Sequence, residues 1–173
     1  DKPVLLKREI GQDLQRSDVV ILMGGVSVGD YDYVKTILHQ LGAKSIFWKV
    51  SQKPGKPIYF GKRGKTLVFG LPGNPASVFV CFYEYVYPAS RAMMGFKEPY
   101  LETEEMSLND EIIPDQKKTL FLKGKRMKEK VKLLSHQGSH MLSSLCQADC
   151  LVVVPPDGAV VRKGKKTKVH LLP

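Results

Sequence analysis

The sequence lacks any apolar run near the roughly 20 residues that a membrane-spanning helix requires, and it shows no signal-peptide pattern. It also contains no internal repeat and no low-complexity tract. We therefore expect no membrane span, no secretion signal and no repeat fold in this sequence. The chain begins with Asp1 instead of methionine, so we expect a piece of a longer protein or a processed one.

Cysteine is scarce: the chain has three, Cys81, Cys146 and Cys150, an odd number without the spacing of a metal site. Such a set predicts reduced thiols in a cytoplasmic protein. Cys146 and Cys150 are interpreted as small core residues.

Acidic residues are outnumbered, 17 against 27 lysines and arginines, which gives a net charge of +10. This excess suits nucleic acid, an anionic surface or an anionic small molecule. The basic residues between Lys123 and Lys132 alternate with a period of two and lack interleaved aromatic residues. We therefore interpret them as the solvated side of a strand and predict no nucleic-acid binding.

Residues 1–97 have the pattern of an α/β domain. After a short amphipathic helix in residues 1–17, a strand at 18–23, a glycine loop, a helix at 34–41 and a strand at 45–50 predict a βαβ unit with a right-handed crossover. Residues 51–57 are predicted as a loop. Segments 58–60 and 66–69 flank Gly61–Lys65 as a hairpin, and a helix follows to about Met94, which Pro88 should interrupt.

Residues 98–173 have a different pattern, in which short segments alternate apolar and polar residues. A linker at 96–100 separates them from the first part, and a short helix is expected at 141–147. The predicted strands lie within residues 101–113, 119–127, 128–135, 150–154 and 168–172. The fold class is therefore α/β, a partial parallel-sheet domain followed by a small all-β C-terminal domain, with the boundary between residues 97 and 98.

Two bends follow predicted strands. In Gly70–Ser77, two glycines and two prolines fix the backbone, with Asn74 as the expected N-cap and Pro75 as the first helical residue. A helix start of this kind presents backbone N–H groups to an anion. The alternative is a turn that only connects a strand to a helix.

The second bend is the loop Gly24–Gly29. Ligands of parallel sheets bind at the carboxyl ends of strands, where Gly24 and Gly25 would allow close approach and Ser27 could donate its hydroxyl. Asp32 is a candidate Mg²⁺ ligand beside a phosphate, and Asp30 a candidate helix cap. The alternative is a tight strand-to-helix turn.

The segment Lys53–Pro57 holds two lysines, Lys53 and Lys56, on a proline-stiffened loop, with Lys49 just upstream. Ammonium groups held at a fixed separation suit an oxyanion, although a solvated lysine loop would look the same. Near the end of the chain, the pair His136 and His140 lacks a third metal ligand, so we favour Ser139 as a hydroxyl donor on a glycine turn.

Four segments together carry a resemblance to a known family: GGVSVGDYDYV (24–34), KPGKP (53–57), GLPGNPAS (70–77) and HQGSHMLSSL (136–145). In this order they closely resemble the MoeA-type molybdopterin molybdenumtransferases, which include the E domain of gephyrin. The resemblance covers nearly the whole chain. It implies the later part of a MogA-like α/β domain followed by the family's C-terminal β domain.

This resemblance implies an enzyme that inserts molybdenum from molybdate into adenylylated molybdopterin and releases AMP, with Mg²⁺. The matching positions are Asp32 in the nucleotide–metal pocket, Lys49 and Lys53 in the substrate groove, Lys53, Lys56 and Ser77 at molybdate, Pro72 and Pro75 in the crevice floor, and Ser139. Lys123 stands where the family usually has arginine and lacks its planar fork. No residue identifies itself as a nucleophile or base.

The resemblance further implies a homodimer in the full-length protein, with a MogA-like adenylyltransferase as a partner. Two other functions stay open: a non-enzymatic scaffold of the gephyrin type, and a MogA-like molybdopterin adenylyltransferase. Residues 98–173 argue against the latter, which resembles the first domain alone. We expect the 173-residue chain by itself to be poorly active, because the family's groove also uses parts of the chain that are missing.

Overall fold

The structure is a computed structural model, and it describes the chain except residues 1–2, 25–30, 136, 139–142 and 157–158. The chain divides into two compact units, each considered by itself. The first consists of Asp1–Val50 and Gly55–Asn74, and the second of Ser51–Pro54 and Pro75–Pro173.

The first unit is built around one four-stranded sheet in the order β1-β5-β4-β2. Its elements are α1 (Pro3–Arg16), β1 (Val19–Met23), α2 (Tyr31–Gln40), β2 (Lys44–Trp48), β4 (Tyr59–Arg63) and β5 (Thr66–Leu71). Strands β1 and β5 are parallel, whereas β4 is antiparallel to both β5 and β2. The sheet is therefore mixed, with its one described parallel pair at the β1 end.

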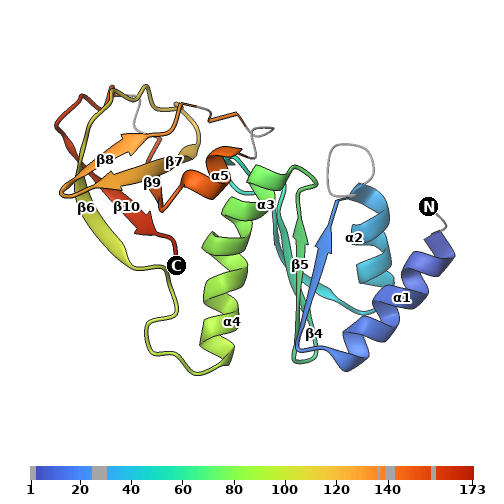
Figure 1. Cartoon of the computed structure of the whole chain (residues 1–173). Coiled ribbons are helices and arrows are strands. Elements are labelled where there is room, and N and C mark those ends of the chain that lie inside the picture. Colours follow the sequence, from blue (N-terminus) through green and yellow to red (C-terminus); the bar gives the residue numbers. More distant parts are fainter. Residues whose placement is uncertain (1–2, 25–30, 136, 139–142, 157–158) are drawn as a thin grey trace. The chain divides into compact units, whose positions relative to one another are not determined.

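Both helices of this unit lie on the same side of the sheet (Figure 1). Ile10 and Leu14 of α1 and Leu38 of α2 are buried together with Val20 of β1 and Val68 of β5. These residues carry the periodicity from which the two helices were predicted, so the apolar face of each helix is what holds it to the sheet.

The two strands of the predicted βαβ unit run in the same direction, as expected, but they are not neighbours in the sheet. By their pairings β1 and β2 run the same way, yet β5 and β4 lie between them. The predicted hairpin is present and tighter than expected, since Arg63 pairs with Thr66 across the two residues Gly64 and Lys65. The expected loop was too long because Gly61 to Arg63 continue strand β4.

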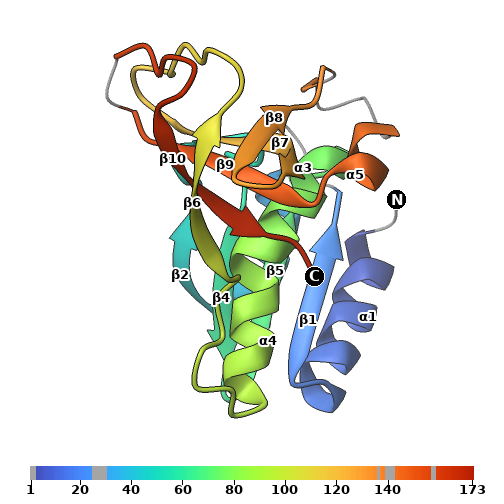
Figure 2. The same cartoon turned by 60° about the vertical axis from the view of Figure 1, so that its left-hand side comes forward.

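The second unit is a small β barrel with a helical segment. Its sheet order is β3-β7-β8-β6-β10-β9, and the pairing of β7 with β9 closes it. The strands are β3 (Gln52–Lys53), β6 (Thr103–Leu108), β7 (Thr119–Met127), β8 (Lys130–Leu133), β9 (Cys150–Val154) and β10 (Lys166–Leu171); a short helix, α5, spans Ser143–Gln147. Figure 2 shows β10 between β6 and β9. The predicted strands, short helix and fold class are confirmed.

The barrel interior explains the alternating pattern in the sequence. Its buried residues include Met106, Val131, Val152 and Val169, one from each of four strands. Neighbouring residues such as Lys130 and Lys168 are exposed. The basic stretch after Lys123 is solvated as predicted, because its charges lie outside this core.

The helical segment consists of α3 (Pro75–Cys81), η1 (Phe82–Val86) and α4 (Tyr87–Met93). The predicted interruption at Pro88 is confirmed as the one-turn π-helix η1, in which the N–H of Tyr87 donates to the carbonyl of Phe82, five residues back. Proline has no N–H and its ring crowds the preceding turn, so the helix widens just before it.

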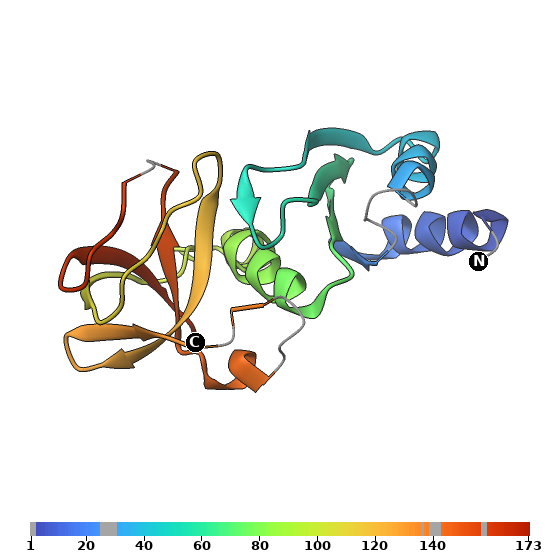
Figure 3. The ribbon, with the colours of Figure 1, turned by 90° about the horizontal axis from the view of Figure 1, so that it is seen from above.

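Residues 51–57 are not all loop, because β3 forms a parallel pair with β7 (Figure 3). Cys150 is buried as expected, but Cys146 is exposed, and all three cysteines are free thiols.

By its contacts the helical segment belongs to the second unit, while the boundary between residues 97 and 98 stays a prediction. Among the described helices, none has the length and apolarity to cross a membrane.

Candidate oxyanion site

The two predicted bends meet within the first unit. Because β1 and β5 are parallel neighbours with Met23 opposite Leu71, both chains leave the sheet at the same edge. There the N–H of Gly24 donates to the carbonyl of Leu71 at 3.4 Å. A Cβ added to Gly73 would lie 3.5 Å from the Cα of Gly24. Gly24 has a left-handed backbone (φ 79°) that favours glycine. The two bends are therefore in contact at the edge where ligands of parallel sheets bind.

Several predicted site residues cannot be placed. Gly25, Ser27 and Ser139 lie outside the described residues. Asp32 belongs to α2, but its side chain is not among those described. Its expected contact with Mg²⁺, like the hydroxyl roles of the two serines, stays a prediction.

The bend after β5 is partly buried, with Gly73 and Pro75 exposed. Pro72 is buried and Asn74 is half-buried. Pro75 is the first residue of α3, as predicted. Ser77 is only 7% exposed in the first turn of that helix. The division between the two units falls between Asn74 and Pro75, so the bend connects them covalently.

Lys49, predicted for the substrate groove, and Lys56, predicted for the molybdate site, belong to the first unit. The N–H of Val50 donates to the carbonyl of Lys56 at 3.0 Å, which closes the loop between them. Lys49 has a left-handed backbone (φ 66°). Its ammonium lies 3.8 Å from the ring centroid of Trp48, and the ammonium of Lys35 lies 4.5 Å from the same centroid. This cation–π contact favours one position for the Lys49 ammonium.

Lys53 belongs to the second unit, where it pairs with Leu120 of β7 and its side chain is exposed. The preceding residue, Gln52, contacts the Sγ of Cys81 at 3.8 Å. Ser77 lies one helical turn before Cys81 on α3. Within this unit, therefore, the strand of Lys53 packs against the helix that carries Ser77.

Lys123 is the largest departure from the sequence interpretation, because its side chain is 3% exposed. Its Nζ donates to the Oγ of Ser144 at 2.6 Å and to the carbonyl of Gly138 at 3.4 Å. The side-chain amide of Gln137 hydrogen-bonds both the N–H and the carbonyl of Lys123. Lys123 thus anchors the segment around Gly138, and its binding of a substrate oxyanion stays a prediction.

Burial lowers the pKa of Lys123 from its usual 10.5. Between the lowered pKa and 10.5 the unfolded chain binds more protons than the folded one at this position, so stability there rises with pH. We expect the free energy of unfolding of the wild type, relative to Lys123→Met, to increase as the pH rises through that window. Urea unfolding of both proteins at several alkaline pH values measures this difference, and a pH-independent difference would contradict it.

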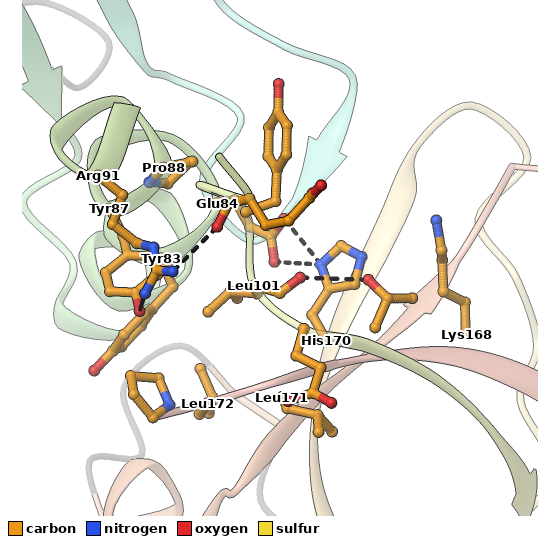
Figure 4. Close-up of a pocket in the computed structure, with 15 residues that line it drawn as sticks. Tyr83, Glu84, Tyr87, Pro88, Arg91, Leu101, Lys168, His170, Leu171 and Leu172 are labelled. Carbon is orange, nitrogen blue, oxygen red and sulfur yellow. Dashed lines mark hydrogen bonds and ion pairs between the residues drawn. The ribbon is translucent and has the colours of Figure 1, made fainter. Parts of the chain in front are cut away.

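Sequence inspection missed a cavity of about 810 Å³ in the second unit (Figure 4). Its wall holds a hydrogen bond between two side chains, in which the Nδ1 of His170 lies 2.9 Å from the Oε1 of Glu84. Nearby, the Nη1 of Arg91 donates to the hydroxyl of Tyr87 at 2.9 Å. None of the described predicted site residues lines this cavity. The interruption predicted at Pro88 was a sequence signal for the π-helix that supplies Glu84 to this cavity.

The metal prediction finds no support among the described side chains. Within that part of the chain, no three His, Cys, Asp or Glu residues gather closely enough to hold a metal ion. Mg²⁺ therefore remains an expectation from the resemblance, and no chemical step is assigned to it.

Comparison with known proteins decides the family. A family model described as "Probable molybdopterin binding domain" matches residues 1–92, and one described as "MoeA C-terminal region (domain IV)" matches residues 105–172. The chain belongs to the MoeA-type molybdopterin molybdenumtransferase family. Its two matched segments follow the order predicted from the four motifs.

Two of the curated relatives of this MoeA-type chain are named molybdopterin molybdenumtransferase, and a third is named gephyrin. A molybdopterin molybdenumtransferase of Nostoc is 35% identical across the whole chain, which covers 42% of that protein. The Haemophilus influenzae protein of the same name is 33% identical, over 91% of the chain and 41% of the relative. Gephyrin of Dictyostelium discoideum is 34% identical, over 99% of this chain and 28% of that protein. The chain therefore spans about two fifths or less of these relatives.

Solved structures agree on the fold. A molybdenum cofactor biosynthesis protein from Pyrococcus furiosus superposes with a TM-score of 0.79 at 24% identity, covering 99% of this chain and 55% of that one. The MoeA protein of Pyrococcus horikoshii OT3 superposes with a TM-score of 0.79 at 24% identity, covering 99% of this chain and 40% of that one. At this identity the likeness supports the fold alone.

Proposed function

We propose that the chain is the part of a molybdopterin molybdenumtransferase that binds molybdate and the adenylylated molybdopterin into which molybdenum is inserted, with release of AMP. The observation that carries the proposal is the meeting of the two bends at one sheet edge, where Gly24 contacts the Leu71–Gly73 turn. Family membership supplies the identity of the anions.

The described residues suit the proposed parts. Backbone N–H groups at the bends would bind phosphate oxygens, and the exposed ammonium groups of Lys53 and Lys56 would neutralise molybdate, with Ser77 donating a hydroxyl. Rate acceleration would come from positioning and charge stabilisation, which need no nucleophile from the protein. Mg²⁺ bound near Asp32 would screen the phosphate charges.

The same proposal extends to the setting of the protein. We infer a cytoplasmic protein that forms a homodimer in full length and receives its substrate from a MogA-like adenylyltransferase. The free cysteines support the compartment. The other two inferences rest on the family.

Of the alternative functions, a separate adenylyltransferase is disfavoured by the match of residues 105–172 to the MoeA C-terminal region. A scaffold of the gephyrin type has no specific observation in its favour. The enzymatic proposal is tested by supplying the full-length protein with adenylylated molybdopterin and measuring AMP release with and without molybdate. Molybdate-dependent AMP release is expected; its absence, with partner binding retained, would favour a scaffold.

A further inference from the structure

Gln52 is a buried polar residue directly before Lys53, and all of its described contacts lie in the second unit. Its side chain is 3% exposed. The Nε2 group donates to the carbonyl of Pro54 at 2.9 Å and contacts the Sγ of Cys81 at 3.8 Å. Its Oε1 accepts a short hydrogen bond from the hydroxyl of Tyr85. Both ends of the amide are therefore engaged.

The chemistry of the partners fixes which way this amide points. Burial raises the pKa of Tyr85 to about 12, so at neutral pH its phenol keeps the proton and can donate it. The carbonyl of Pro54 can only accept. The Gln52 oxygen must then face Tyr85 and its nitrogen must face Pro54, which is a single orientation with each hydrogen bond satisfied.

The backbone of the same segment is held from a second direction. Gln52 and Lys53 pair with Thr119 and Leu120 of β7, and the N–H of Thr119 donates to the carbonyl of Ser51 at 3.0 Å. Residues on both sides of Lys53 are thus fixed, by the β7 ladder and by the bond to Pro54. The Lys53 side chain itself is exposed, so its ammonium group extends towards solvent from a backbone that is held on both sides.

We propose that Gln52 is a positioning residue for Lys53: its buried amide ties the Pro54 carbonyl to Cys81 and Tyr85 on the helix and so holds the lysine where it meets an oxyanion. The inference rests on the proposed function, because it assigns Lys53 to molybdate. The inference gives a role to Gln52, which lies outside the four motifs. It also explains why a polar side chain, Tyr85, lies on the side of η1 that faces Gln52. An apolar residue at position 52 would fill the space but leave the Pro54 carbonyl and the Tyr85 hydroxyl without this partner.

The test measures molybdate binding to the full-length protein by equilibrium dialysis, together with amide hydrogen exchange in residues 51–54. Gln52→Leu removes the whole contact, and Tyr85→Phe removes one hydrogen bond with little change of shape. Lys53→Ala reports on the proposed site itself. Val131→Ala, in the buried barrel core, is the control for a loss of stability that should not disturb the segment.

We expect Gln52→Leu and Tyr85→Phe to weaken molybdate binding by roughly tenfold, by analogy with the loss of a group that orients a metal ligand. Exchange in residues 51–54 should become faster, and Val131→Ala should change neither quantity. If Lys53→Ala binds weakly while both other variants bind like the wild type, the positioning role is wrong and the proposed site stands. If Lys53→Ala binds like the wild type, the proposed site fails and the positioning role with it. Should Gln52→Leu not fold, Tyr85→Phe decides alone.

Discussion

Replacing Lys53 or Lys56 with alanine is expected to weaken molybdate binding strongly while leaving the fold almost unchanged. Both side chains are exposed, and exposed side chains usually contribute no more than about 0.5 kcal/mol to the free energy of unfolding. A charge-assisted hydrogen bond to an anion contributes roughly 1.5–3 kcal/mol. That is roughly a 10- to 100-fold loss of affinity for each lysine.

The measurement pairs a molybdate titration with thermal unfolding for each variant. Lys97→Ala, at another exposed lysine, is the matched control and should change neither affinity nor melting temperature. A parallel loss of melting temperature and molybdate response in Lys53→Ala would show that the lysine acts through the fold and would contradict the assignment.

Gly61→Ala is expected to produce the largest loss of stability among the single-methyl changes considered. A Cβ at Gly61 would lie 2.5 Å from the hydroxyl oxygen of Tyr59 and 2.7 Å from the carbonyl oxygen of Lys44. Tyr59 is itself buried, at 3% exposure, and the Lys44 carbonyl is backbone of the neighbouring strand β2. Separating β2 from β4 to make room should cost about 2–3 kcal/mol.

A second glycine in the same unit provides the control. Gly11 lies within α1, where an added Cβ would meet only the flexible end of Leu41 at 3.4 Å. In a helix interior, alanine is more stable than glycine by roughly 0.5–1 kcal/mol. Urea unfolding should therefore show Gly61→Ala less stable and Gly11→Ala slightly more stable than the wild type. Equal stabilities of the two variants would show that β2 yields freely.

The sequence was sufficient for the elements whose signals are local. Pro75 begins a helix because proline suits the first helical turn, and Pro88 interrupts one because it lacks an N–H. The alternation of residues 103–171 predicted the barrel strands, since one face of each is buried. The four motifs predicted the family for the same reason: they are contiguous in sequence.

The misses depend on contacts between segments that are far apart in the chain. Nothing in Gln52–Lys53 alone indicates a strand, because its partner β7 comes some 65 residues later. Lys123 was counted among solvated charges, yet it is buried against Ser144, 21 residues away. The cavity beside His170 combines a helix with the last strand. Such pairings are set by tertiary packing, which overrides the local pattern.

We propose that Lys53 and Ser77, both in the second unit, bind one oxyanion. The most direct test is a crystal of the full-length protein soaked with tungstate, located by its anomalous signal. We expect a single strong peak within hydrogen-bonding distance of the Lys53 ammonium group and the Ser77 hydroxyl. A peak confined to the cavity beside Arg91 and His170, or none near Lys53, would contradict the proposal.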